Sequence, residues 1–333
     1  MRIGSLFSGF GGLDLGVQAV LGGTVAWHVE NDSDASAVLA HHWPDTRNLG
    51  DITRVDWSQV DRVDVLTGGF PCQDLSTAGQ RAGLRPDTRS GLWSQMAYAV
   101  SVLRPRLVIA ENVRGLLSAR ADCQVEPCPW CLGDDTGSAM RALGVILADL
   151  ADLGYDAAWC GLRAADVGAP HGRFRVFVVA ADADSVGPLR ARAPRGRESE
   201  PAHDGSATPD RERHALRQQP VADGGRGGAP VTGDDCTRVG DFGSYEPAVR
   251  RWESLLDRNA PVPTVDGRRA DRVLNPAFVE WMQGVEPGWV TDVPNISRGA
   301  ALRILGNGVV PQQVSAALPW LLTTLAAPMS EAP

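Results

Sequence analysis

The sequence contains no lysine, so all 32 of its basic side chains are arginines. With 40 aspartates and glutamates the net charge is −8, which argues against a uniformly basic nucleic-acid-binding protein but leaves room for a local basic surface. No run of about 18 apolar residues is present, so we expect no transmembrane helix. The first residues, MRIGSLFSGFGG, lack the basic and apolar regions of a signal peptide, and we therefore expect a cytoplasmic protein.

Cysteine is also scarce, because six in 333 residues are too few for a disulfide-based scaffold. Cys123, Cys128 and Cys131 lie closest together, and the CPWC spacing of the last two would let two thiolates share a zinc ion. A closed zinc site needs a fourth ligand, and no spacing rule selects among Cys160, His171 and His203. We therefore predict no metal site. Reduced thiols or a redox pair are expected here, with structural zinc as the alternative.

Up to about residue 181, short apolar segments alternate with segments of helical periodicity. Alternation at this spacing predicts a doubly wound, mostly parallel α/β sheet. The expected strands are Arg2–Phe7, Thr24–Val29, Val63–Leu66, Leu107–Ala110 and Val176–Ala180. The expected helices run from the glycine-rich loop to about Leu21, from about Asp34 to His42, and from Ser138 to Leu153.

From residue 182 to 241 the chain is rich in Arg, Gly, Pro, Asp and Ser, and large apolar residues are few. Such a composition cannot build a compact core alone, so we expect much of it to be loop. Between residues 182 and 269 there are 14 arginines and 15 acidic residues, so the segment is not basic overall. A flexible insertion without function is the alternative. Ordered patterning resumes with a predicted helix near Tyr245, and a last helix is predicted over Pro311–Leu325.

A glycine-rich loop, FSGFGGLDLG, follows the first predicted strand. Glycines there let the backbone approach a ligand at the start of a helix, whose N-terminus favours negative charge. Glu30 ends the second predicted strand about 20 residues on, where an acid can accept hydrogen bonds from ribose hydroxyls. Asp51 follows a short third strand and could contact an adenine edge. The pattern favours an adenosine-containing cofactor other than NAD, and a tight strand–helix turn is the alternative.

Three polar groups of residues follow or precede predicted strands: Cys72 in PCQ, Glu111 in ENV, and Arg173 with Arg175 in HGRFR. The carboxyl ends of parallel strands line one crevice of an open sheet, so we expect these side chains to be near one another. A thiol in positive surroundings is a nucleophile, and a carboxyl group beside it can exchange a proton with a heteroaromatic substrate. A buried inert thiol, a helix-capping acid and surface arginines are the alternative interpretation.

In sequence order, the segments FSGFGGLDLG, GGFPCQDLS, ENV, APHGRFRVF and LGNGVVPQ resemble the DNA cytosine-5 methyltransferase family of bacteria and phages. The resemblance covers roughly residues 1 to 180 and 272 to 325. It implies a Rossmann-like sheet that binds S-adenosylmethionine, with a smaller target-recognition domain. The implied division is a catalytic and cofactor-binding domain over 1–181, a target-recognition region over 182–271, and a return to the catalytic domain over 272–333.

The resemblance also implies roles in catalysis. Cys72 would add to carbon 6 of cytosine, and Glu111 would contact ring nitrogen 3 and the exocyclic amine. Arg173 and Arg175 match arginines that contact the base, the phosphate backbone and the active-site loop. The family's glutamine before these arginines is replaced by His171.

For the cofactor, the resemblance assigns Phe7, Gly9 and Gly11 to the methionine side and Glu30 to the ribose. The adenine would be contacted by Asp51 and Ile52, and Asn307 would complete the pocket. Gly308 stands where the family often has serine, and Gln80–Trp93 matches the loop that closes on the substrate.

The expected activity is therefore methylation of carbon 5 of a flipped-out cytosine within a specific sequence of double-stranded DNA, as in restriction–modification. A tRNA cytosine-5 methyltransferase and a catalytically silent DNA-binding protein are the alternatives. Family members act mostly as monomers, and a cognate restriction endonuclease is a candidate partner.

Overall fold

A computed structural model describes residues 1–70, 91–117, 142–183, 242–267 and 271–327. All of them belong to one compact unit made of residues 1–193 and 240–333, while a second unit, Pro194–Val239, lies outside the described residues. Also outside them are Cys72, Cys123, Cys128, Cys131, His203 and most of the segments Gln80–Trp93 and 182–271. Among the helices that are described, none combines the length and the apolar character needed to span a membrane.

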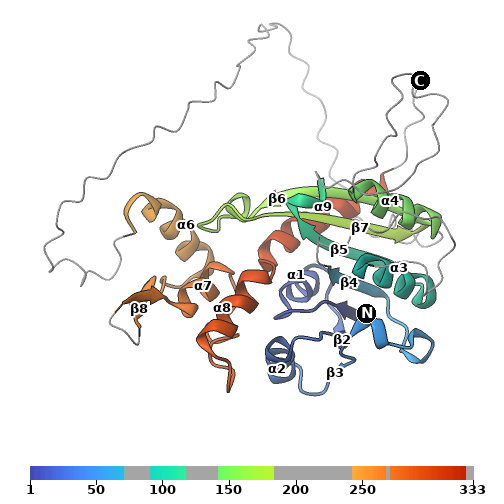
Figure 1. Cartoon of the computed structure of the whole chain (residues 1–333). Coiled ribbons are helices and arrows are strands. Elements are labelled where there is room, and N and C mark those ends of the chain that lie inside the picture. Colours follow the sequence, from blue (N-terminus) through green and yellow to red (C-terminus); the bar gives the residue numbers. More distant parts are fainter. Residues whose placement is uncertain (71–90, 118–141, 184–241, 268–270, 328–333) are drawn as a thin grey trace, which may run out of the picture. The chain divides into compact units, whose positions relative to one another are not determined.

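The unit is built around a seven-stranded sheet with the order β3-β2-β1-β4-β5-β7-β6 (Figure 1). The strands are β1 (Arg2–Leu6), β2 (Thr24–Val29), β3 (Arg47–Asn48), β4 (Val65–Gly69), β5 (Leu107–Val113), β6 (Tyr155–Arg163) and β7 (Phe174–Asp182). Strands β3, β2, β1, β4 and β5 pair in parallel, whereas β7 is antiparallel to both β5 and β6. The strand order reverses between β1 and β4, and open α/β sheets bind ligands at such a switch point.

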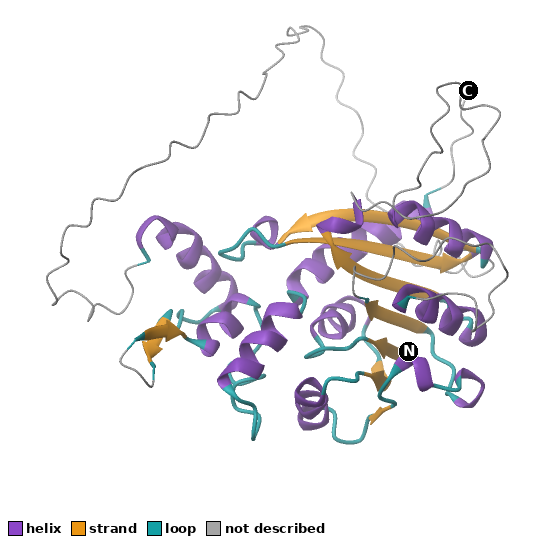
Figure 2. Ribbon diagram, in the orientation of Figure 1, coloured by secondary structure: helices purple, strands orange, loops and turns teal. Residues whose placement is uncertain are grey.

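Helices cover both faces of the sheet, as Figure 2 shows. The helices are α1 (Gly12–Leu21), α2 (Ser33–His42), α3 (Leu92–Leu103), α4 (Ala142–Asp152), α6 (Glu246–Leu256), α7 (Pro276–Met282), α8 (Arg298–Asn307) and α9 (Pro311–Ala326). Apolar residues of α1 and α9 pack on one face of the central strands, and those of α3 and α4 pack on the other. Because helices cover both faces of the sheet, the side chains on either face of a central strand are buried, and these strands are therefore nearly continuous runs of apolar residues.

The C-terminal third of the chain returns to the first. Helix α9 packs with α1 on the sheet, and residues of α2, α7 and α8 surround the buried ring of Phe10. A two-stranded hairpin, β8 (Thr264–Asp266) with β9 (Arg272–Leu274), precedes α7. The predicted boundary between residues 271 and 272 falls inside this hairpin, and the domain division stays a prediction.

The mostly parallel sheet predicted from the sequence is confirmed. The predicted second strand, Thr24–Val29, has the observed bounds, and the first predicted strand ends one residue later than the observed one. Helix α3 and strand β6 were not predicted. Helix α3 has apolar residues around most of its circumference, and β6 is an edge strand of mixed polarity held by its pairing with β7, so neither has a strong local pattern.

Candidate active site

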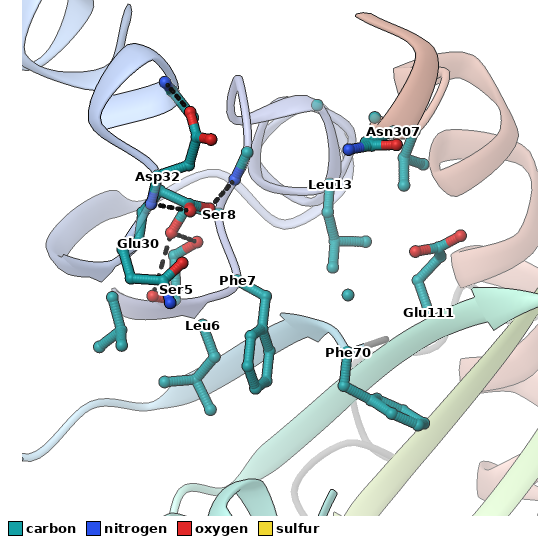
Figure 3. Close-up of a pocket in the computed structure, with 18 of the residues that line it drawn as sticks. Ser5, Leu6, Phe7, Ser8, Leu13, Glu30, Asp32, Phe70, Glu111 and Asn307 are labelled. Carbon is teal, nitrogen blue, oxygen red and sulfur yellow. Dashed lines mark hydrogen bonds between the residues drawn. The ribbon is translucent and has the colours of Figure 1, made fainter. Parts of the chain in front are cut away.

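A cavity of about 670 Å³ opens at the carboxyl ends of β1, β2, β4 and β5 (Figure 3). Eight of the residues predicted from the sequence line it: Phe7, Gly9, Glu30, Asp51, Ile52, Glu111, Arg175 and Asn307. Gly11 and Arg173 lie outside the lining, and Cys72 is not among the described residues. The volume is in the range of cofactor and substrate pockets, which are commonly about 300 to 1,000 Å³.

The loop after β1 adopts a backbone that glycine favours. Gly9 has φ 56° and Gly11, the residue that precedes α1, has φ 85°. A Cβ atom on Gly11 would also lie 2.5 Å from the ring of Trp43, so a side chain there would be strained and crowded. This conformation brings the first residues of α1, Gly12 and Leu13, to the cavity wall.

Glu30 holds the glycine loop against the start of α2. Its carboxylate accepts a hydrogen bond from the Gly9 N–H at 2.8 Å and another from the Asp32 N–H at 2.9 Å (Figure 3). Each carboxylate oxygen has further lone pairs, so this acid can still accept hydrogen bonds from a ligand's hydroxyl groups. Glu30 is therefore both a structural tie and a candidate ligand contact.

The other predicted cofactor residues lie around the same cavity. Asp51 caps the short 3-10 helix Ile52–Arg54. The hydrogen bond from the Thr53 backbone N–H has the largest effect on the Asp51 carboxyl, and together with the bond from the Thr53 side chain it lowers the pKa of this group. Ile52 is buried and Asn307 ends α8 at the rim. A Cβ atom on Gly308 would overlap the ring of Phe10, so the aromatic ring explains why glycine stands here.

Glu111 and Arg175 form a buried ion pair at the inner end of the cavity. Glu111 Oε1 lies 2.5 Å from Arg175 Nε, a contact of opposite charges without the alignment of a hydrogen bond. Burial raises the pKa of Glu111 to about 7, although the positive charges of Arg175 and Arg173 act in the opposite direction. Near neutral pH this carboxyl group can therefore be protonated and can donate a hydrogen bond.

Arg173 forms hydrogen bonds with the C-terminal part of the chain. Its guanidinium donates to the carbonyl oxygens of Gly306 at 2.6 Å and Gly308 at 2.7 Å, the two residues that flank Asn307. His171 Nε2 lies 3.1 Å from the carbonyl oxygen of Met282, and burial lowers the pKa of this imidazole. The segment that leads into β7 is thus tied to the end of α7 by His171 and to the residues that flank Asn307 by Arg173.

Several residues that organise the cavity were not predicted from the sequence. Arg303 of α8 lines the rim and forms ion pairs with Asp32 and, at 2.7 Å, with Asp34. Asn112 donates to the carbonyl oxygen of Phe70 at 2.8 Å, which ties the end of β4 to β5. A buried group of polar residues lies beneath the glycine loop: Ser5, Ser8, Asp14, His28 and Thr67. In the sequence, each of these residues is only a polar residue within an apolar segment, and that pattern does not identify its hydrogen-bond partners.

Within the described part of the chain, no group of three or more His, Cys, Asp or Glu residues could hold a metal ion. Of the candidate zinc ligands, Cys160 lies half-buried on β6, and burial raises the pKa of its thiol. The CPWC segment is outside the described residues, so reduced thiols or a redox pair there, with zinc as the alternative, remain a prediction.

Comparison with known proteins identifies a family for the first two thirds of the chain and relatives that match about half of it. The family model for C-5 cytosine-specific DNA methylase matches residues 1–222. Type II methyltransferase M.HgiBI of Herpetosiphon aurantiacus is 35% identical over 181 residues, which make up 54% of this chain and 36% of that relative. Type II methyltransferase M.NlaIV of Neisseria lactamica is 35% identical over 178 residues, 52% of this chain and 39% of that relative. The chain thus spans little more than a third of the length of these relatives.

Among solved structures, that of a Spodoptera frugiperda DNMT2 mutant matches with a TM-score of 0.56. The sequences are 17% identical, and the match covers 97% of this chain and 99% of the other. A likeness at this level of identity is a likeness of fold, and it confirms the predicted Rossmann-like architecture.

Proposed function

Because the chain belongs to the C-5 cytosine-specific DNA methylase family, we propose that it transfers a methyl group from S-adenosylmethionine to carbon 5 of cytosine in double-stranded DNA. The observation that carries this proposal is the protonatable Glu111 held by Arg175 at the inner end of the cavity. A cytosine ring needs such a donor at nitrogen 3 when a nucleophile adds to carbon 6.

The described residues fit S-adenosylmethionine. Glu30 offers a carboxylate to ribose hydroxyls, and Asp51 with Ile52 forms a polar and an apolar contact for the adenine. Phe7, Gly9 and the start of α1 would contact the methionine part, and Asn307 would complete the pocket. When bound, the cofactor supplies an electrophilic methyl group.

The chemistry requires a nucleophile, and the PCQ sequence supplies Cys72 for it. The thiolate of Cys72 would form a bond to carbon 6 of cytosine while nitrogen 3 takes a proton from Glu111. The resulting enamine makes carbon 5 nucleophilic, so that it would take the methyl group as the bond between this group and the sulfur of its donor breaks. Loss of the carbon 5 proton to a base, departure of the thiolate from carbon 6 and return of the nitrogen 3 proton to Glu111 would restore the aromatic ring and the starting protonation state.

Burial of Glu111 serves this reaction in two ways. Removal from water raises its pKa to about 7, which keeps a proton available for nitrogen 3. Arg175 restrains the carboxyl group and stabilises the anion that remains after proton transfer.

A cytosine inside a duplex cannot present carbon 6 to a thiol, so the target base would be flipped out of the stack at a cost of a few kcal/mol. Residues 182–271 are the proposed target-recognition region, where arginines would contact phosphates and a few side chains would contact base edges. Action as a monomer in the cytoplasm, beside a cognate restriction endonuclease, remains a prediction from the family.

Bisulfite sequencing of DNA from cells that express the protein tests the proposal. We expect methylated cytosines confined to one short sequence in cells with the unchanged chain. Cells that express Cys72→Ser serve as the control and should show none. Methylation of tRNA in place of DNA would support the RNA alternative, and no gain in either nucleic acid would contradict an enzymatic role.

A further inference from the structure

Asp14 is a fully buried carboxylate that the proposed mechanism does not use. It lies in the first turn of α1, beneath the glycine loop, with 0% of its surface exposed. The hydroxyl of Ser5 on β1 donates to Asp14 Oδ2 at 2.6 Å, and the hydroxyl of Thr67 on β4 donates to Asp14 Oδ1 at 2.6 Å. One carboxylate therefore bridges two neighbouring strands of the sheet through two short hydrogen bonds.

These two strands carry different parts of the cavity. Strand β1 continues into Phe7 and Gly9 on the proposed cofactor side. Strand β4 continues into Gly69 and Phe70, and Phe70 is bonded to Asn112 beside Glu111 on the proposed base side. The bridge by Asp14 thus lies at the switch point of the sheet, where the two sides of the cavity separate.

The hydrogen bonding extends from Asp14 toward the glycine loop. The hydroxyls of Ser5 and Ser8 lie 2.8 Å apart, and Ser8 lies 3.3 Å from His28 Nδ1 on β2. Burial lowers the pKa of His28 to about 4, so this imidazole is neutral at physiological pH and adds no compensating charge. Ser5 and Ser8 also line the cavity, so the polar group reaches the proposed cofactor.

Burying a carboxylate costs free energy of desolvation, and packing alone does not require a charged group at this position. Burial raises the pKa of Asp14 to about 6, and the hydrogen bonds from Ser5 and Thr67 offset only part of this effect. The hydrogen-bond partners in the described structure are hydroxyl groups, and no arginine forms an ion pair with it there. An apolar side chain would fill the same place without the penalty for desolvation.

We propose that Asp14 is a positioning residue that fixes the spacing between the cofactor loop after β1 and the base-binding end of β4. The inference rests on the proposed methyltransferase function. Methyl transfer needs the donor carbon and the cytosine ring in near-attack geometry, and a displacement of about 1 Å can cost about 100-fold in rate. By joining Ser5 to Thr67, Asp14 would hold the two binding sites in that geometry.

Four single variants and one double variant, Thr67→Val combined with Asp14→Ala, separate this role from simple packing. Thr67→Val keeps the side-chain shape but removes the donor on β4, and Thr67 does not line the cavity. Asp14→Ala removes both bonds, whereas Asp14→Asn can retain a polar link to both hydroxyls. Ser315→Ala is the matched control, because Ser315 contacts α1 at the Gly16 carbonyl without contacting Asp14. For each variant we would measure the dissociation constant of S-adenosylmethionine by calorimetry and kcat on DNA, well below the lowest Tm.

Thr67→Val should lower kcat about tenfold while the dissociation constant changes less than about twofold, because the β4 side of the bridge is released. Asp14→Ala should lower kcat at least as much and also weaken cofactor binding several-fold, with partial recovery in Asp14→Asn. The double variant should be no slower than Asp14→Ala, because Thr67→Val and Asp14→Ala break the same connection between β1 and β4. Ser315→Ala should match the unchanged chain.

Two results would overturn the inference: a Thr67→Val enzyme with unchanged kcat, or a double variant whose losses are additive. If Asp14→Ala fails to fold, the isosteric Thr67→Val still decides the question. If the unchanged chain methylates no nucleic acid, the proposed function fails separately. Binding of S-adenosylmethionine then tests the role of Asp14 by itself, and equal dissociation constants for the unchanged chain and Asp14→Ala would reject that role.

Discussion

Glu111 Oε1 and Arg175 Nε lie 2.5 Å apart, with less than a tenth of either side chain exposed. The register of the sheet creates this contact, because Glu111 on β5 is opposite Phe177 and Arg175 on β7 is opposite Val113. The two residues are therefore diagonal neighbours on adjacent antiparallel strands, within reach of long side chains. The antiparallel strand β7 thus delivers a cation to an acid at the carboxyl end of a parallel strand.

The first prediction concerns the pH dependence of kcat. Glu111 has a pKa raised to about 7, so the protonated donor is present below that pH and is lost above it. We expect kcat to fall on the alkaline side with an apparent pKa near 7. Glu111→Gln cannot transfer a proton, and its kcat should be about 100-fold lower without this alkaline decline. Rates from pH 6 to about 9 check this, and an identical decline in Glu111→Gln would assign the titration to another group.

A second prediction concerns the packing of Phe10 against the turn that follows α8. A side chain at position 308 would overlap the Phe10 ring, so Gly308→Ser should lower the free energy of unfolding by about 1 to 3 kcal/mol. Gly306→Ser is the control, since a Cβ atom there meets nothing within 4 Å. Urea denaturation of both variants measures the difference. Equal stability of the two would mean that Phe10 moves aside without cost.

The site residues that could be predicted from the sequence are polar residues at the carboxyl ends of apolar strands. Glu30 follows β2 and Glu111 lies near the carboxyl end of β5, directly after the predicted strand Leu107–Ala110, and parallel strands place their carboxyl ends together. Their position at one cavity could therefore be predicted without knowledge of long-range contacts. The glycine loop is also a local feature, because glycine adopts the positive φ angles found there without help from distant residues.

The remaining parts of the site depend on contacts between distant residues. The resemblance implies that Arg173 and Arg175 contact the base, the phosphate backbone and the active-site loop, which stays a prediction. It does not indicate the carbonyl oxygens, more than 130 positions later in the chain, to which Arg173 donates. Asp14 reads as one polar residue in the first turn of an amphipathic helix, a position favoured by the helix dipole. Its bonds to Ser5 and Thr67 follow from strand order, which no local pattern specifies.

A third prediction concerns Glu280, a buried carboxylate that holds the loop after α7. It accepts hydrogen bonds from the N–H groups of Gly288, Val290 and Thr291, and from the Thr291 hydroxyl, at 2.6 to 3.0 Å. Glu280→Gln would direct an amide N–H₂ at one of these donors, so we expect a loss of about 3 kcal/mol in the free energy of unfolding.

The same loop contacts the glycine-rich loop beside the proposed cofactor site, because the Trp289 indole N–H donates to the Phe10 carbonyl oxygen at 2.9 Å. Glu280→Gln should therefore also weaken binding of S-adenosylmethionine, measured by calorimetry. Glu286→Gln is the control in the same loop. Its side chain is 85% exposed and 3.9 Å from Arg258, so its removal should change stability by less than about 1 kcal/mol. A Glu280→Gln protein as stable as Glu286→Gln would contradict the assignment.

The last prediction concerns the effect of Asp14 on stability as pH changes. Burial raises its pKa from 3.8 to about 6, so the folded state binds a proton more tightly than the unfolded state. A group of this kind contributes its full share of stability below its unfolded pKa, and that share is lost as pH rises through the folded pKa. Asp14→Asn does not titrate. The free energy of unfolding of the unchanged chain, relative to Asp14→Asn, should therefore fall by about 1.4 kcal/mol between pH 5 and pH 8.

The neighbouring His28 has the opposite dependence, because burial lowers its pKa to about 4 and stability is lost as pH falls. This contribution is common to both proteins and cancels in their difference. Urea denaturation at pH 5, 6, 7 and 8 gives that difference directly. A difference that stays constant over this range would show that the Asp14 carboxyl is charged throughout, and that the hydroxyls of Ser5 and Thr67 offset its burial in full.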